Sequence, residues 1–236
     1  MKFSENNVHF ITLMGNSDRV NNVKNIMTTV LPKSNIFNAI DANSLSEKEL
    51  NYYIDIGYIS KEYIERVKRG RKTMGVIGCT ISHILLWKKL IESDCDYYII
   101  CEDDIVMTDK FLIEIKKVFS EITPDMDYIS LYRHPHFEKK QIAYQSKIFN
   151  SYAYIAKSIP MYGAVCYYIS KNGAKKIFDY LRDSKSIGEN DTMVYHMILY
   201  NKINAFCSYK SLVDTAGPIG KKDALTRKTK IKSTLW

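Results

Sequence analysis

The stretch Tyr97-Tyr98-Ile99-Ile100-Cys101-Glu102-Asp103-Asp104-Ile105-Val106 decides how the rest of the chain is interpreted. It opens with five largely apolar residues, which are typical of a short buried strand, and three acidic residues follow at once. A desolvated charge costs several kcal/mol unless it is paired or bound to a metal, so the acids do not belong in the middle of a strand. We therefore place them at its end, where an open α/β sheet forms its ligand-binding crevice.

The acidic triplet has two interpretations. It could form a solvated turn or cap the next helix, but Thr108 and Asp109 already supply a cap for the amphipathic run at 111–122. The alternative is a metal or sugar site. If the strand continues through the acids, alternation places Glu102 and Asp104 on the same side. Two oxygen ligands so placed suit Mg²⁺ or Mn²⁺ held jointly with a substrate phosphate.

Length and composition predict one globular domain. The chain has 236 residues, of which 46% are hydrophobic and 25% charged, and it contains no low-complexity segment. We expect a single domain over 1–236 with its core at about 8–215 and a basic tail at 216–236. No apolar run approaches the roughly 20 residues that cross a bilayer, and residues 1–7 lack a signal-peptide core. These features predict a cytoplasmic chain.

Positive charge is concentrated in two segments of a chain whose net charge is +8. Residues 61–72 hold six basic side chains against two acidic ones, and 217–236 hold six against one. Such local charge favours an anionic ligand, or peripheral contact with an anionic membrane surface, over nucleic-acid binding. Solvated basic faces are the alternative.

Cysteine and histidine give no metal pattern of their own. The five cysteines are an odd number without a Cys-x-x-Cys pair, which predicts buried thiols rather than a zinc site or a disulfide framework. His134-Pro135-His136 lies in a lysine-rich loop, where exposed side chains are the simpler interpretation. His83 falls in an apolar helical run at 79–93, so a core histidine with satisfied hydrogen bonds is its default interpretation.

The order of predicted elements favours an α/β fold. Residues 8–13 alternate as a strand, a helix capped by Asn16 or Ser17 follows, and 36–40 form the next strand. This β-α-β opening predicts a parallel sheet. Ser46 and Glu49 form a capping box before another helix, and Asp191 is expected to cap a helix at 192–200. Further strands are expected at 128–131, 150–156, 164–170 and 203–207, and a further helix at 172–181.

Several segments also match, in order, the motifs of one enzyme family. The most specific is 75–83, with Gly78, Cys79, Ser82 and His83, and the acidic triplet follows at the expected place. These segments resemble glycosyltransferase family 25, the lipooligosaccharide and collagen β-galactosyltransferase group. The other matching segments are Ile11-Thr12-Leu13 with the later Arg19, Ala39-Ile40-Asp41-Ala42, Tyr162-Gly163-Ala164 and Tyr168-Ile169-Ser170-Lys171-Asn172-Gly173-Ala174.

The resemblance implies a GT-A-like fold, a Rossmann-type α/β/α sandwich, and an inverting transfer of a hexose from a UDP-sugar. Galactose is the first expectation for the sugar and glucose the second, with a glycan or glycoprotein as acceptor and lipopolysaccharide biosynthesis as one setting. Asp104 with Glu102 would hold Mn²⁺ or Mg²⁺, and Asp191 would be the catalytic base, with Glu189 in reserve. The donor-binding residues implied are Thr12, Leu13, Arg19, Gly78, Ser82, His83, Glu102 and Asp103.

Two other functions stay open at this point. Acids at a strand end can also hold two metals around a phosphate, as in a metal-dependent phosphoesterase. The abundant tyrosines would also suit a non-catalytic glycan-binding module on a transferase fold.

Overall fold

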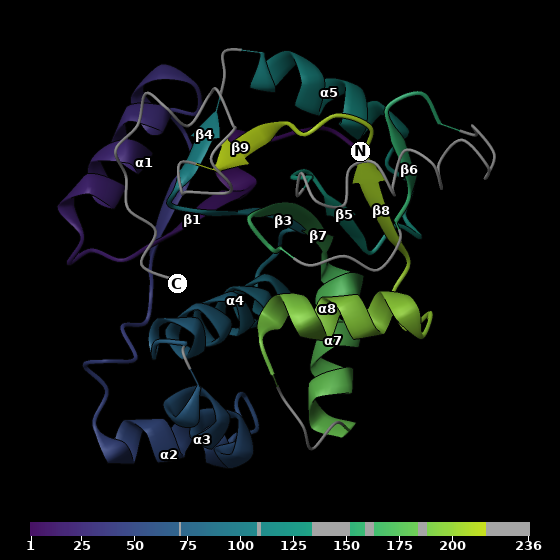
Figure 1. The fold of residues 1–236 in the computed structure, drawn as a ribbon. Helices are drawn as coiled ribbons and strands as arrows, with labels where there is room; N and C mark the ends of the chain where they lie inside the picture. Colours follow the sequence, from purple (N-terminus) through teal and green to yellow (C-terminus); the bar gives the residue numbers. More distant parts are fainter. Residues whose placement is uncertain (71, 108–109, 134–151, 159–162, 184–187, 216–236) are drawn as a thin grey trace.

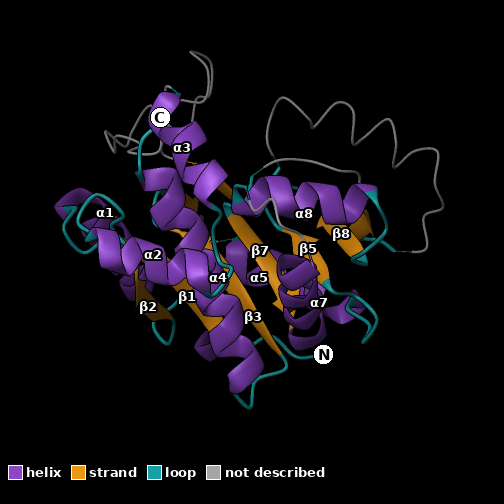
Figure 2. Cartoon of the chain, turned by 90° about the horizontal axis from the view of Figure 1, so that it is seen from below, coloured by secondary structure: helices purple, strands orange, loops and turns teal. Residues whose placement is uncertain are grey.

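A mixed sheet runs through the middle of the molecule (Figures 1 and 2). Its seven strands follow the order β2-β1-β3-β7-β5-β8-β6. The structure, a computed structural model, describes residues 1–70, 72–107, 110–133, 152–158, 163–183 and 188–215. A second sheet pairs only β4 with β9. The strands are β1 (Val8–Thr12), β2 (Asn35–Asn38), β3 (Tyr97–Glu102), β4 (Ile105–Met107), β5 (Tyr128–Ser130), β6 (Ile155–Lys157), β7 (Cys166–Ser170), β8 (Ala205–Ser208) and β9 (Val213–Thr215).

Strand direction determines where a ligand can bind. β1 pairs in parallel with both β2 and β3, and β7 is antiparallel to both β3 and β5. β5 therefore runs in the direction of β3, as does β8, which is parallel to β5. The chain leaves β1 on one side to form β2 and returns on the other side to form β3. The carboxyl ends of β1 and β3 are thus adjacent at a switch point, where open α/β sheets bind ligands.

Helices cover both faces of the sheet, with α1 and α5 on one and α4, α7 and α8 on the other (Figures 1 and 2). Alternation along β3 explains this, because Ile99 and Cys101 pack toward α1 and α5 while Tyr98 and Ile100 pack toward α4, α7 and α8. The predicted Rossmann-type α/β/α sandwich is confirmed. The helices are η1 (Glu5–Asn7), α1 (Ser17–Thr29), α2 (Glu47–Asp55), α3 (Lys61–Arg69), α4 (Gly75–Glu92), α5 (Phe111–Glu121), α7 (Lys171–Asp183) and α8 (Asn190–Leu199).

Several local predictions are confirmed. Asn16 caps α1 by accepting the Arg19 N–H, and Ser46 with Glu49 forms the capping box of α2. Cys101, Cys166 and Cys207 are buried cysteines. None of the helices in the described part of the chain is both long and apolar enough to cross a membrane.

Three local predictions are wrong. The helix expected at 79–93 already begins at Gly75, because packing of its first turns overrides the low helix propensity of glycine. Of the strand expected at 150–156, the described residues 152–154 are not strand and pairing begins with β6 at Ile155, since the Glu121 carboxylate accepts the N–H groups of residues 153–155. Asp191 does not cap α8; Glu189 holds the N-cap position. Thr108, Asp109 and the stretch 134–136 lie outside the described residues.

Candidate active site

The acidic triplet lies at the carboxyl end of β3, beside the end of β1. The strand stops at Glu102, and the other two acids form the turn before β4, so strand alternation does not extend to Asp104. Asp103 accepts the Leu13 N–H at 3.1 Å, which ties the turn to the end of β1. The side-chain amide of Asn22 donates to the Asp103 and Ile105 carbonyl oxygens, each at 2.9 Å. The turn is therefore held from both neighbouring segments.

Arg19 lies beneath this turn, only 4% exposed. Its guanidinium forms an ion pair with Asp103 and lies 3.4 Å from Asp104 Oδ2. Because a buried charge that loses its partner costs several kcal/mol, the pairing fixes the turn as well as the arginine. The predicted contact of Arg19 with the nucleotide stays a prediction, since in this structure its guanidinium faces carboxylates.

Arg19 alone does not neutralise the negative charge of the three acids. Burial and the charge of Asp103 raise the pKa of Glu102 to about 7. Burial and the charge of Glu102 raise the pKa of Asp104 to about 6. Asp104 Oδ1 is buried and has no hydrogen-bond partner among the described residues. A surplus of carboxylate charge around an unpartnered oxygen fits a hard divalent cation such as Mn²⁺ or Mg²⁺.

The first turns of α4 explain why glycine and serine occur four residues apart. A Cβ at Gly78 would overlap the carbonyl oxygen of Ile40, so only glycine lets the helix approach this closely. Ser82 donates to the Gly78 carbonyl oxygen at 2.7 Å and accepts the Ile40 N–H at 2.8 Å. Both residues therefore dock α4 onto the segment after β2.

The adjacent stripe of α4 faces the acids. Cys79 Sγ lies 3.9 Å and His83 Nε2 3.7 Å from Glu102 Oε1. Burial and the nearby carboxylates, Glu102 first among them, raise the pKa of the Cys79 thiol well above its usual range. Burial lowers the pKa of His83 to about 3, so its ring is neutral. His83 is fully buried.

Asp191 reaches the same site from the first turn of α8. Its Oδ2 accepts the Gly163 N–H at 3.2 Å and its Oδ1 the Thr192 N–H at 2.6 Å. Gly163 has φ +102°, a conformation that favours glycine. Burial and the charge of Glu189 raise the pKa of Asp191, and the charge of Asp191 in turn raises the pKa of Glu102. The two carboxylates therefore interact electrostatically, although they lie 89 positions apart in the chain.

Glu189 and Lys72 form an ion pair, and the charges of both residues act on Asp191. Lys72 Nζ lies 2.5 Å from Glu189 Oε1 in a half-exposed ion pair. The charge of Lys72 also lowers the pKa of Asp191, although burial outweighs it. One member of the basic segment at 61–72 is thus next to the candidate base.

One known protein family covers most of the chain. The family described as "Glycosyltransferase family 25 (LPS biosynthesis protein)" matches residues 5–194, which include the acidic turn, Arg19 and Asp191. The chain belongs to glycosyltransferase family 25.

Individual relatives are distant. The family-25 chain is 28% identical over 135 residues to the lipooligosaccharide biosynthesis protein lex-1 of Haemophilus influenzae, covering 56% of this chain and 44% of the relative. It is 25% identical over 181 residues to a glycosyltransferase 25 family member of Aedes aegypti, covering 75% and 28%. Human procollagen galactosyltransferase 2 is 27% identical over 108 residues, covering 44% and 17%. These matches span less than half the length of each relative.

Among solved structures, the galactosyltransferase LgtC in complex with donor and acceptor sugar analogues is 12% identical, covering 84% of this chain and 72% of that chain. The TM-score is 0.42, which is too low to carry an argument about fold or function.

The predicted residues of the family-25 chain fall into two groups. The acids, Leu13 and Arg19 lie together, His83 lies 3.7 Å from Glu102, and the charge of Asp191 acts on Glu102. Gly78 and Ser82 instead dock a helix, and the Thr12 side chain is buried with its hydroxyl on the Phe10 carbonyl. Three residues of this region were not predicted from the sequence to belong to it: Asn22, which holds the acidic turn, and Trp87 and Tyr167, which lie beside His83. Asn22 lies one turn after Arg19 and Trp87 one turn after His83, so helical spacing could have found both.

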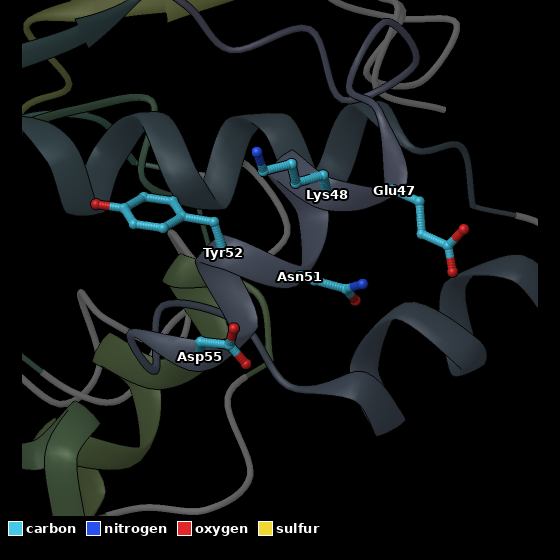
Figure 3. Close-up of a pocket in the computed structure, with 5 residues that line it drawn as sticks. All are labelled: Glu47, Lys48, Asn51, Tyr52 and Asp55. Atoms are coloured by element: carbon cyan, nitrogen blue, oxygen red, sulfur yellow. The ribbon is translucent and has the colours of Figure 1, made fainter.

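A surface hollow on α2 is separate from this site (Figure 3). Its lining comes entirely from one helix, and every lining residue is exposed, so these side chains are not desolvated. The lining residues are Glu47, Lys48, Asn51, Tyr52 and Asp55.

Proposed function

We propose that this chain is an inverting glycosyltransferase that moves a hexose from a UDP-sugar to a glycan or glycoprotein acceptor, forming a β-linkage. The observation that carries the proposal is the acidic turn at the switch point of the sheet, where Asp104 Oδ1 is unpartnered among the described residues and the charge of Asp191 acts on Glu102. Galactose is the preferred sugar and glucose the second. The names of the relatives, lipooligosaccharide biosynthesis protein and procollagen galactosyltransferase, support this choice of sugar and acceptor.

Asp104 and Glu102 are the residues that would hold Mn²⁺ or Mg²⁺. The cation, when bound, would offset negative charge on the UDP leaving group. Arg19 and the Leu13 N–H hold Asp103, and through it the turn, so Asp104 is presented from a rigid backbone. Fixed carboxylates of this kind bind a cation with little cost of ordering.

Asp191 is the proposed base. Two backbone N–H groups fix its carboxylate, and its raised pKa suits a group that takes a proton from an acceptor hydroxyl at neutral pH. Attack on the face opposite the leaving group converts an α-linked donor into a β-linked product. Glu189 is the reserve candidate, although its ion pair with Lys72 already holds it.

Positive charge would assist donor binding. Of the basic segment at 61–72, Lys72 pairs with Glu189 and its charge acts on the candidate base, and we assign it to the donor phosphates. We propose residues 8–215 as the transferase core. The basic segment at 216–236 lies outside the described residues, and its contact with an anionic membrane surface is a proposal from charge alone.

The test is donor turnover with product analysis. Purified protein with Mn²⁺ should release UDP from UDP-galactose faster than from UDP-glucose or UDP-N-acetylglucosamine. With a competent acceptor, proton NMR of the product should show the large anomeric coupling of a β-galactoside. An α-linked product, or preference for a donor without UDP, would overturn the proposal.

The same assay separates the rival functions. A phosphoesterase would release inorganic phosphate or nucleotide fragments without any acceptor, and a glycan-binding module would bind sugar without turnover.

A further inference from the structure

Three buried side chains, Trp87, Tyr167 and His83, contact one another in that order, and His83 lies next to Glu102. Trp87 Nε1 lies 2.8 Å from the hydroxyl oxygen of Tyr167, and His83 Nδ1 lies 2.7 Å from the same oxygen. Trp87 and His83 are one turn apart on α4, and Tyr167 faces them from β7. All three side chains are fully buried, so water does not compete for these hydrogen bonds.

Donor and acceptor accounting fixes the tautomer of His83. The indole N–H can only donate, so the Tyr167 oxygen accepts from Trp87. The phenol proton then needs an acceptor, and His83 Nδ1 is the one that the described residues place within hydrogen-bond distance. An accepting Nδ1 carries no proton. In the neutral ring the proton therefore sits on Nε2.

The Nε2–H group points toward the active site. Nε2 has no hydrogen-bond partner among the described residues, and Glu102 Oε1 lies 3.7 Å away. That separation exceeds the range of a hydrogen bond, about 2.7–3.2 Å, so a movement of the carboxylate by about 0.5 Å would close it. Because this N–H is fully buried, it can reach the reaction through the adjacent carboxylate of Glu102.

We propose that Trp87 and Tyr167 hold His83 as its Nε2–H tautomer, and that this N–H group orients the Glu102 carboxylate within the active site. The functional half of the inference rests on the proposed role of Glu102. Trp87, Tyr167 and His83 are positioning residues. One oxygen of Glu102 is directed toward His83, which leaves the other for the cation or the donor.

A metal site at the same place is the competing arrangement. Ligand atoms of Cys79, His83 and Glu102 lie within 4.8 Å of one another, and cysteine with histidine favours zinc. Zinc, however, needs Nε2 without its proton. Moving that proton to Nδ1 would leave the buried phenol proton of Tyr167 without an acceptor. The two arrangements therefore require opposite tautomers.

The first experiment reads the tautomer directly. Long-range ¹H–¹⁵N NMR of the ¹⁵N-histidine-labelled full chain should show a protonated Nε2 and an unprotonated Nδ1 for His83, assigned by its loss in His83→Gln. Tyr167→Phe should abolish this fixed pattern, whereas Tyr98→Phe should keep it. Tyr98 is the matched control, because it is a buried tyrosine on the same face at the other end of β3. A protonated Nδ1, or stoichiometric zinc that is lost in Cys79→Ser, would overturn the inference.

The second experiment reads the consequence for the reaction. Tyr167→Phe should lower kcat with UDP-galactose roughly 10-fold at unchanged KM, in the range for lost outer-shell contacts, while Tyr98→Phe keeps the parent rate. His83→Gln retains an N–H near the Nε2 position and should keep more activity than His83→Leu. Equal losses in these two variants would remove the positioning role. Absence of transferase activity in the parent chain would instead count against the proposed function, and the NMR result would still decide the tautomer.

Discussion

Asp104 is where the charge of the site is least balanced. One of its oxygens lies 3.4 Å from Arg19, while the other is buried without a partner among the described residues. Arg19 keeps its closer partner, Asp103, whatever occupies position 104. A substitution at Asp104 can therefore remove a ligand oxygen without leaving the buried guanidinium unpaired.

We predict that Asp104→Asn abolishes Mn²⁺-dependent binding of UDP while the fold is retained. The change removes one charge and one strong ligand oxygen from the site. Isothermal titration of UDP with and without Mn²⁺ measures the binding, and circular dichroism checks the fold. Asp55→Asn, at an exposed carboxylate on α2, is the control. Unchanged metal-dependent affinity in Asp104→Asn would exclude Asp104 as a ligand.

We predict that Asp191→Asn lowers kcat by a factor on the order of 10² to 10⁴ while UDP binding persists. The amide cannot take a proton from the acceptor hydroxyl. Stability should fall by only about 1 kcal/mol, for one backbone N–H that loses its acceptor, because Asp191 is not the N-cap of α8. Stopped assays give kcat and thermal melts give stability. If Glu189→Gln shows the larger loss of kcat, the base is Glu189.

The residues of the site were only partly predictable. The acids after β3 could be placed because a buried strand excludes them from its interior, and that inference needs only local sequence. The Arg19 ion pair depends on β1 and β3 being neighbours, which no local pattern encodes. The roles of Gly78 and Ser82 were equally hidden, because each serves a backbone contact with Ile40.

At the scale of elements, the position of α4 determines where Cys79 and His83 lie relative to Glu102. The first two turns of α4 pack against the segment after β2, and this contact sets the position of the helix. Alanine favours a helix over glycine by up to about 1 kcal/mol, so Gly78→Ala would stabilise α4 if space allowed. A Cβ at Gly78 would instead overlap the Ile40 carbonyl oxygen, which is backbone and cannot rotate away. Whether Gly78→Ala raises or lowers the free energy of unfolding therefore tests the close packing of α4 against Ile40.

We predict that Gly78→Ala destabilises the protein by about 1–3 kcal/mol and lowers kcat, because α4 must shift and displace Cys79 and His83 from Glu102. Gly15→Ala is the control, since a Cβ there meets no atom within 4 Å. Urea unfolding of both variants measures the difference. A stabilised Gly78→Ala would show that the contact is looser than the structure indicates.

The spacing of apolar residues predicted most helices and strands. It failed where a tertiary contact set the end of the element. Apolar spacing identified α1, α5 and β3, whose side chains divide cleanly between the two faces of the sheet. It placed the start of α4 too late, since glycine is a poor helix former in isolation. It also extended β6 into residues whose N–H groups are bound by Glu121, a side chain that is distant in sequence.

At the scale of the whole molecule, the sequence predicted an α/β sandwich but not the order of its strands. The β-α-β opening requires a parallel start, and the structure confirms it. The insertion of β7 antiparallel between β3 and β5 could not be predicted, because alternating apolar residues do not specify the direction of pairing. That insertion places Tyr167 against α4.

The charge of the site affects the stability of the entire chain. The folded pKa values of Glu102 and Asp104, about 7 and about 6, lie above the ordinary values of 4.5 and 3.8. Between about pH 4 and 7 the folded state therefore binds protons that the unfolded chain has released. Stability from these two groups falls as pH rises through that window, and the full cost is present at pH 8. A divalent cation would take the place of those protons.

We therefore predict that Mn²⁺ raises Tm relative to EDTA more at pH 8 than at pH 5, where it must displace protons from Glu102 and Asp104. At 100 times its Kd a ligand stabilises by about 2.7 kcal/mol, which corresponds to roughly 5–10 °C for a domain of this size. Burial lowers the pKa of His9 to about 4 and that of His83 to about 3, so both rings are neutral in the folded chain at pH 5 and at pH 8 and do not contribute to this difference. Calorimetry at both pH values measures it. Asp104→Asn should lose the increment and Asp55→Asn keep it; an equal increment at both pH values, or one retained in Asp104→Asn, would contradict binding at these carboxylates.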